Sequence, residues 1–254
     1  MLSGVRQISV FGLADRLRAR IERVLDAAKA QGHRQGENVA RWRGHLDHLL
    51  PRRLKLERDH HKAMPYAEVP EFMEKLREMT DVVARALEFT ILTAARRGEV
   101  IGAEWSEFSI DGTIWTIPAA RMKSGREHQV PLPQRAIQIV REMMQLRDAF
   151  VFPGRSRGAR MSGNTMQYLL RHRMKTANAS VHGFRSSFRD WAGDCTSFPH
   201  DVVEAALAHA IENRTEAAYR RGTALEKRRQ LMQAWDNYLA PANQTVVTLK
   251  KKSS

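Results

Sequence analysis

The sequence predicts a mainly α-helical protein with a small three-stranded antiparallel β-sheet in its middle. Over most of the chain, apolar residues recur every three or four positions, which is the spacing of an amphipathic helix. Between residues 108 and 132 this spacing gives way to short β-type runs, and the dipeptide Asp111-Gly112 favours a tight turn between two strands. With 43% hydrophobic residues among 254, the chain is long enough to bury one core and to carry a smaller appendage.

The first 60 residues predict helices without a core of their own. Residues 11–30 place Leu13, Leu17 and Ile21 on one helical face, and a shorter helix is predicted over 39–50. Pro51 ends that helix and begins a basic linker. Because two or three helices do not readily form a stable domain, residues 1–60 are predicted to be an accessory to a larger unit.

From residue 61 to 240 the pattern is denser, and we expect the main domain there. A short amphipathic helix is predicted over 68–79, a buried core helix over 81–95, and a further short helix from 98 towards Trp105. The predicted strands are 108–110, 114–117 and 128–132, with Lys123 near the turn before the third. Helices are then predicted over 134–147, 162–173, 184–192, 201–207, 212–221 and 224–239. Residues 241–254 form a basic tail that we expect to be disordered.

The charge of the chain points to a class of partner. Its 42 Lys and Arg residues exceed its 28 Asp and Glu residues, a formal net charge of +14, and such an excess favours a polyanion, most commonly nucleic acid. An unspecialised basic surface is the alternative. The single cysteine, Cys195, excludes an internal disulfide and a cysteine-rich zinc site. No long apolar run predicts a transmembrane helix and no secretory signal is evident, so we expect a protein of the cytoplasm or nucleoid.

Five segments carry residues suited to a phosphodiester. Phosphoryl transfer without a metal needs cations on the non-bridging oxygens, a proton donor for the leaving oxygen and an aligned nucleophile. Arginine binds phosphate at two points, and a tyrosine hydroxyl needs cations or a base to become a competent nucleophile. Each residue alone has an ordinary structural explanation, such as a helix-end arginine or a packing tyrosine. The segments are Thr93–Glu99, Met122–Gly125, His182–Arg185, Leu207–His209 and Ala217–Arg220.

In order and spacing these segments resemble the tyrosine recombinase family over residues 65–240. The family uses Arg, Lys, His-x-x-Arg, His and Tyr in this chain order, which falls here on Arg96, Lys123, His182, Arg185, His209 and Tyr219. The resemblance implies that Arg96, Arg185 and His209 hold the scissile phosphate and that Glu99 supports them. It implies that Lys123 protonates the leaving 5′ oxygen and that His182 assists proton movement at Tyr219, the nucleophile. It implies no cofactor and no metal.

Further stretches resemble the satellite-phage integrases of prophages and genomic islands, among them Trp42–Leu46, His60–Tyr66 and Arg228–Met232. Members of that subgroup carry an N-terminal arm-binding domain and a complete core-binding domain. Residues 1–60 would then be the C-terminal remnant of a SAM-like helical core-binding domain with its linker, in an N-terminally shortened product. Two alternatives stay open: a shortened DNA-binding relative without recombination activity, and a type IB topoisomerase-like relaxing enzyme.

Clusters of basic residues are predicted to contact double-stranded DNA, and a solvated charged face is their alternative. The resemblance also implies a homotetramer in the synaptic complex, with DNA-bending accessory proteins as further partners. The histidine pairs at 45/48 and 60/61 lack the companions of a metal site, and nothing orients Cys195 as a nucleophile. The last helix either packs in the core or docks on a neighbouring protomer. The predicted DNA-binding residues are Arg41, Arg43, Arg52, Arg53, Lys55, Arg155, Arg157 and Arg160.

Overall fold

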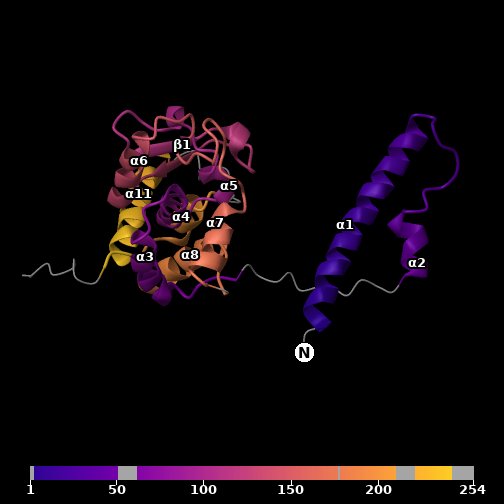
Figure 1. Ribbon diagram of the computed structural model, residues 1–254, viewed down its shortest axis with the longest axis horizontal. Helices are drawn as coiled ribbons and strands as arrows, with labels where there is room; N and C mark the ends of the chain where they lie inside the picture. The colour runs from indigo at the N-terminus through magenta and orange to yellow at the C-terminus, as the bar shows by residue number, and fades with distance from the viewer. Residues whose placement is uncertain (1–2, 51–61, 177, 210–220, 242–254) are drawn as a thin grey trace, which may run out of the picture. The chain divides into compact units, whose positions relative to one another are not determined.

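The computed structural model describes residues 3–50, 62–176, 178–209 and 221–241 (Figure 1). The chain divides into two compact units, Met1–Asp59 and His60–Ser254. Along the described residues, no helix combines the length and the apolar character needed to cross a membrane. The helix predicted over 212–221 lies almost entirely outside the described residues.

The first unit is a long helix with a short return segment. Helix α1 spans Ser3–Ala30, and the π-helical turn η1 (Trp42–Leu46) and α2 (Asp47–Leu49) follow. The buried side chain of Asn38 donates to the Glu22 carbonyl at 2.8 Å, and Arg18 donates to the Ala40 carbonyl at 2.8 Å. The predicted apolar stripe on α1 is present but exposed, from 44% to 66% for Leu13, Leu17, Ile21 and Val24. Polar contacts, more than apolar burial, therefore hold the return segment on α1.

The second unit is mainly helical, as predicted. Its elements in chain order are η2 (Tyr66–Glu68), α3 (Val69–Arg77), α4 (Val82–Thr93), α5 (Arg97–Val100), η3 (Trp105–Glu107), β1 (Ile114–Ile117), η4 (Ala119–Arg121), β2 (His128–Pro131), α6 (Gln134–Met144), α7 (Thr165–Tyr168), η5 (Leu169–Arg173), α8 (Gly183–Cys195), α9 (His200–Ala206) and α11 (Arg221–Tyr238). Within the described residues, the predicted helices of this unit form with their ends shifted by a few residues. The helix predicted over 162–173 is α7 continued by the π-helical turn η5.

Helix α4 forms the centre of the unit, with the other helices arranged around it (Figure 1). Asp81 caps its first turn, because its carboxylate accepts from the backbone N–H groups of Val83 and Ala84 at 3.1 Å each. Residues 84–93 are buried throughout. Phe89 packs with its ring centroid 5.2 Å from that of Phe152, and the Ile91 carbonyl accepts from the indole N–H of Trp235 at 3.0 Å. A helix buried on all sides explains the nearly unbroken apolar run in its sequence.

Among the described residues, the sheet has two strands where three were predicted. Strands β1 and β2 pair antiparallel, with Ile117 opposite His128. The segment 108–110 makes only a single bridge, between Phe108 and Trp115, and then turns at Asp111. The Asp111 carboxylate accepts from the Ser109 hydroxyl at 2.6 Å and from the Thr113 backbone N–H at 3.1 Å. These hydrogen bonds start the turn at residue 109, so the first strand cannot continue. Side chains that bond to nearby backbone in a turn compete with strand pairing.

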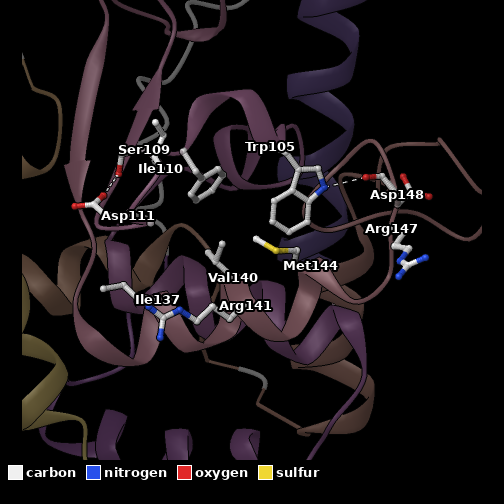
Figure 2. Close-up of a pocket in the computed structure, with 12 residues that line it drawn as sticks. Trp105, Ser109, Ile110, Asp111, Ile137, Val140, Arg141, Met144, Arg147 and Asp148 are labelled. Carbon is white, nitrogen blue, oxygen red and sulfur yellow. Dashed lines mark hydrogen bonds between the residues drawn. The ribbon is translucent and has the colours of Figure 1, made fainter.

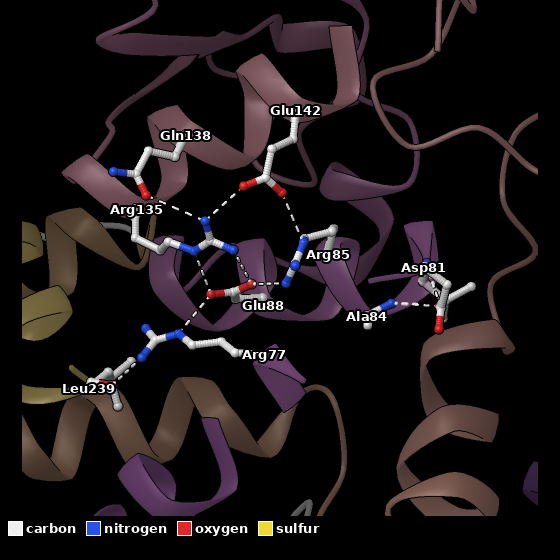
Figure 3. Close-up of polar contacts among 10 residues, drawn as sticks. Arg77, Asp81, Ala84, Arg85, Glu88, Arg135, Gln138, Glu142 and Leu239 are labelled. Atoms are coloured by element: carbon white, nitrogen blue, oxygen red, sulfur yellow. Dashed lines mark hydrogen bonds and ion pairs between the residues drawn. The ribbon is translucent and has the colours of Figure 1, made fainter. Parts of the chain in front are cut away.

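A buried ion network joins four helices around Glu88 (Figure 3). The side chain of Glu88 is fully buried on α4 and accepts from Arg77, Arg85 and Arg135 at 2.9 Å each. Arg77 also donates to the carbonyl of Leu239 at 2.8 Å, just after α11 ends. Several cations are needed to offset the desolvation of a buried carboxylate. The network therefore fixes α3, α6 and the end of α11 on α4.

Candidate active site

The junction between α4 and α5 presents Arg96. Helix α4 ends at Ala94, which adopts a left-handed conformation with φ of 48°, so the chain turns sharply before α5. Arg96 caps α5, and Glu99 lies one turn further on and is buried. The carboxylate of Glu99 accepts from the Arg96 backbone N–H at 2.8 Å and from its Nη1 at 2.9 Å. Glu99 thus holds both the backbone and the side chain of Arg96.

Arg185 on α8 lies against the end of α9. Its guanidinium is buried, donates to the Ala94 carbonyl and donates to the Leu207 carbonyl at 2.6 Å. Arg96 approaches the same chain end, with Nη2 3.5 Å from the Leu207 carbonyl and 3.4 Å from the Ala208 carbonyl. The left-handed conformation of Ala208, with φ of 50°, turns the chain out of α9 at this point. Two arginines from different parts of the chain therefore converge on the Leu207 carbonyl.

The electrostatics of Arg185 are unusual for an arginine. Within the described residues no carboxylate forms an ion pair with it: it donates to two neutral carbonyls, and its Nη2 also lies 3.3 Å from Nε2 of His209. Burial and the nearby charge of Arg96 lower its pKa to about 10. The charges of Glu99 and Glu204 oppose this lowering, but neither carboxylate pairs with Arg185, and a buried cation beside a second cation favours an anionic ligand.

His209 completes the cluster, and Glu204 orients it. His209 Nδ1 lies 2.6 Å from Oε2 of Glu204, and Nε2 lies 3.3 Å from Nη2 of Arg185. Arg189 binds the other oxygen of Glu204, with its Nε 2.8 Å away. Burial alone would raise the pKa of Glu204, but the hydrogen bond with His209 and the charge of Arg189 hold the pKa below its usual range. An ionised Glu204 accepts a hydrogen bond from Nδ1–H, so Nε2 is the ring nitrogen that faces Arg185.

Of the remaining predicted catalytic residues, the structure describes His182 and Lys123. His182 is exposed immediately before the first turn of α8, on the helix that carries Arg185. Lys123 is exposed in the segment between β1 and β2, and no ion pair with Lys123 is found among the described residues. Tyr219 lies outside the described residues. The structure therefore brings together Arg96, Glu99, Arg185 and His209.

Two supporting residues were not identified from the sequence. Glu204 holds His209 from five positions upstream, a separation that has meaning only because the chain turns at Ala208. Arg121, on η4, donates to the carboxylate of Glu107 and to the backbone carbonyl of Glu99. It therefore supports the α5 turn from the sheet side. An acidic residue just before Leu207–His209 was the only sequence pattern that pointed to Glu204.

The residues predicted to bind DNA are described in part. Arg43 is exposed on η1, while Arg41 forms an ion pair with Glu37 at 2.6 Å. Arg155 and Arg157 are exposed, and the guanidinium of Arg160 lies 5.9 Å from the ring centroid of Phe150. Arg52, Arg53 and Lys55 lie outside the described residues.

A separate pocket lies away from this cluster (Figure 2). It has a volume of about 480 Å³ and lies between the segment 105–112 and α6, with Trp105 and Met144 in its wall. None of the predicted site residues lines it. In the parts of the chain that the structure describes, no cluster of three His, Cys, Asp or Glu residues suits a metal ion. The candidate site is the cluster of Arg96, Arg185 and His209, which this pocket does not include.

This cluster and its surrounding fold can be compared with known proteins. A model of the phage integrase family matches residues 62–226, which include all six predicted catalytic residues. The chain belongs to this family, the tyrosine recombinases. A model of the phage integrase central domain matches residues 2–45.

Named relatives agree with this membership. The chain is 34% identical over 187 residues to prophage integrase IntA of Escherichia coli (strain K12), covering 72% of this chain and 45% of that protein. It is 29% identical over 265 residues to the integrase of Enterobacteria phage P4, covering 94% of this chain and 58% of that protein. The chain thus spans about half the length of these relatives.

Solved structures confirm the type of fold. A lambda integrase(75-356) dimer bound to a COC′ core site superposes with a TM-score of 0.56 at 16% identity, over 83% of this chain and 76% of that one. The integrase from mycobacterium phage Brujita superposes with a TM-score of 0.54 at 17% identity, over 87% of this chain and 74% of that one. The second unit is therefore a tyrosine recombinase catalytic-domain fold, with two strands in its small sheet.

Proposed function

We propose that this integrase cleaves and rejoins DNA strands at specific sites through a 3′-phosphotyrosine intermediate. Its biological role would be the integration or excision of a prophage or genomic island in the cytoplasm. The observation that carries the proposal is the convergence of Arg96, Arg185 and His209 on the end of α9, where no carboxylate among the described residues pairs with Arg185.

Each side chain has a chemical role in the proposal. Arg96 and Arg185 hold the non-bridging oxygens of the scissile phosphate and stabilise the charge of the transition state. His209 adds a third contact, in the orientation that Glu204 gives it. Tyr219 attacks the phosphorus and stays joined to the 3′ phosphate, while Lys123 protonates the departing 5′ oxygen and His182 assists proton movement at Tyr219.

Rejoining reverses the same step. A 5′ hydroxyl of the partner strand attacks the phosphotyrosine and releases Tyr219, so the phosphodiester bond energy is conserved without ATP. The cations of the site supply the charge stabilisation, so the proposal includes no metal or cofactor.

Partners follow from the chemistry and from the relatives. Double-stranded attachment-site DNA is the substrate that we propose, with Arg41, Arg43, Arg52, Arg53, Lys55, Arg155, Arg157 and Arg160 on its backbone. A lambda integrase tetramer bound to a Holliday junction superposes on this chain with a TM-score of 0.51 at 16% identity. For this chain we propose a homotetramer in the synaptic complex and DNA-bending accessory proteins.

A covalent-trapping assay tests the function. The protein is incubated, with EDTA present, with nicked duplexes that span the junctions of the genetic element carrying its gene, and the products are resolved on a denaturing gel. We expect a protein–DNA adduct from the wild type and none from Tyr219→Phe, which keeps the ring but lacks the nucleophilic oxygen. The mutant is expected to bind the same DNA almost as tightly.

Other outcomes separate the alternatives. DNA binding without an adduct on any junction would favour a DNA-binding relative without recombination activity. Relaxation of a supercoiled plasmid that lacks these junctions would favour a topoisomerase-like activity. An undiminished adduct in Tyr219→Phe would remove Tyr219 from its role.

A further inference from the structure

Helix α11 begins at Arg221, two residues after Tyr219 in the sequence. Among the residues of α11 whose side chains are described, Arg228 is the first to bond to another element. Its Nη1 donates to the carbonyl of Gln129 on β2 at 2.7 Å, and its Nε donates to the Ala224 carbonyl in its own helix at 3.3 Å. Arg228 therefore fixes the early part of α11 to the start of β2.

Arg228 makes this contact without a counter-charge. Within the described part of the chain it has no ion-pair partner, whereas its neighbour Arg229 lies 3.5 Å from Glu226. Burial lowers the pKa of Arg228. A half-buried guanidinium that bonds only to carbonyls is a poor device for stability alone, because its desolvation is offset by hydrogen bonds and not by an opposite charge.

His128 connects this anchor with the phosphate-binding cluster. It is the first residue of β2, adjoining Gln129, and the charges of Arg228 on α11 and of Glu99 and Arg96 near α5 all act on its imidazole. The backbone of Ala206, at the end of α9, also hydrogen-bonds to it. Burial and the charge of Arg228 lower the pKa of His128 to about 4, so the ring is neutral at neutral pH. A neutral ring lets Arg228 lie close without adding a repelling cation.

The start of β2 is also where the turn that carries Lys123 ends. Lys123 lies five residues before His128, and the turn between them closes through a hydrogen bond from the Gly125 N–H to the Met122 carbonyl at 3.0 Å. The first two residues of β2 therefore follow the Lys123 turn and contact α11 through Arg228. His128 also lies within the electrostatic influence of Arg96 and Glu99.

We propose that Arg228 is a positioning residue: by holding the start of α11, which follows Tyr219 by two residues in the sequence, it keeps Tyr219 in register with Arg96 and Lys123. This rests on the proposed function, in which Tyr219 is the nucleophile. Loss of the Arg228 anchor would misalign the attacking oxygen of Tyr219. A misplacement of about 1 Å can lower a rate about a hundredfold.

Three variants of the full chain test the proposal. Arg228→Ala removes the anchor, Arg228→Lys keeps the charge with a single flexible donor, and Arg229→Ala is the matched control one residue away. The first measurement is amide hydrogen exchange in peptides covering 221–232 and 126–132. We expect faster exchange in both peptides for Arg228→Ala, a smaller increase for Arg228→Lys, and wild-type exchange for Arg229→Ala.

The second measurement is the rate of adduct formation at saturating DNA. It uses ordinary DNA and DNA whose leaving 5′ oxygen is replaced by sulfur, a better leaving group that needs no proton donor. For Arg228→Ala we expect at least a tenfold slower rate on both substrates, with the apparent Kd for DNA unchanged. Arg228→Lys should recover part of that rate, and Arg229→Ala should match the wild type.

Each outcome decides something different. Rescue of Arg228→Ala by the sulfur substrate would place Arg228 at the leaving group and overturn the proposal. Unchanged hydrogen exchange in Arg228→Ala would also overturn it, because the anchor would then not hold α11. If Arg228→Ala exchanges faster but the wild type forms no adduct, the contact between Arg228 and β2 is structural only. In that case the proposed function fails, and with it the positioning role for Tyr219.

Discussion

His209 Nδ1 lies 2.6 Å from Oε2 of Glu204, and this contact sets which nitrogen of His209 faces Arg185. Glu204 is itself held by Arg189, so the orientation of the imidazole depends on a chain of two contacts. In such arrangements the residue that orients a histidine matters nearly as much as the histidine.

Replacing Glu204 by Gln should therefore slow cleavage. We expect adduct formation to fall by at least about tenfold, since the amide no longer fixes the Nδ1 proton and Nε2 can turn away from Arg185. Glu226→Gln, a change of an exposed glutamate on α11, serves as the control and should leave the rate unchanged. Equal rates for Glu204→Gln and the wild type would show that Glu204 is only a partner of Arg189.

The role proposed for Lys123 predicts a chemical rescue. Lys123→Ala should slow adduct formation on ordinary DNA by about 100-fold or more, because the leaving oxygen loses its proton donor. On DNA with sulfur at the leaving position the same mutant should cleave at nearly the wild-type rate. Arg126→Ala alters another exposed cation of the same turn and should show neither effect. A Lys123→Ala defect that persists with sulfur would assign Lys123 to DNA binding.

Gly183, immediately after His182, predicts a difference between two glycines of one helix. A Cβ at Gly183 would lie 2.2 Å from the Lys62 carbonyl oxygen, in the segment that Ser180 binds through its backbone N–H at 2.9 Å. Gly183→Ala should lower the free energy of unfolding by about 1–3 kcal/mol, because backbone must move to admit the methyl group. Urea unfolding measures this.

The control for that change is Gly193→Ala in the same helix. A Cβ at Gly193 meets nothing within 4 Å, so this change should be neutral or stabilise by up to about 1 kcal/mol through helix propensity. Equal stabilities of the two variants would mean that residues 62–63 do not pack on α8 as described.

The network around Glu88 predicts a dependence of stability on pH. Burial would raise the pKa of Glu88, but hydrogen bonds from Arg135 and Arg77 hold it below its ordinary value of 4.5. Because the folded pKa is depressed, the ionised carboxylate stabilises the fold fully above about pH 4.5, and this contribution is lost as the pH falls through the folded pKa.

Glu88→Gln isolates that contribution. At pH 7 we expect the free energy of unfolding to fall by about 3–5 kcal/mol, since three arginines lose their shared charge. The difference between wild type and mutant should stay constant from pH 6 to 8 and shrink below about 4.5. Urea unfolding across this pH range gives the difference, and one that grows in acid would contradict the assignment.

Local patterns made much of the second unit predictable. The apolar run of 81–95 predicted a buried helix, and α4 is buried on all sides. The Asp111-Gly112 turn was predicted correctly, but the strand before it was not, because the number of ladder bonds depends on how the Asp111 carboxylate caps that turn. The apolar face of α1 was also predicted, but its residues are exposed. The spacing of apolar residues predicts a helical face and does not show whether another element packs on it.

The sequence by itself determined the residue types of the site and their order, from Arg96 to Tyr219, because a chemical motif needs only identity and spacing. The tertiary structure decided which of them meet. Arg96 and Arg185 come together at the carbonyls of Ala208 and Leu207, and a sequence does not show which backbone carbonyls a side chain will reach. It also decided the partners Glu204 for His209 and Gln129 for Arg228. The physical reason is that hydrogen bonds act over about 3 Å in space, whatever the separation along the chain.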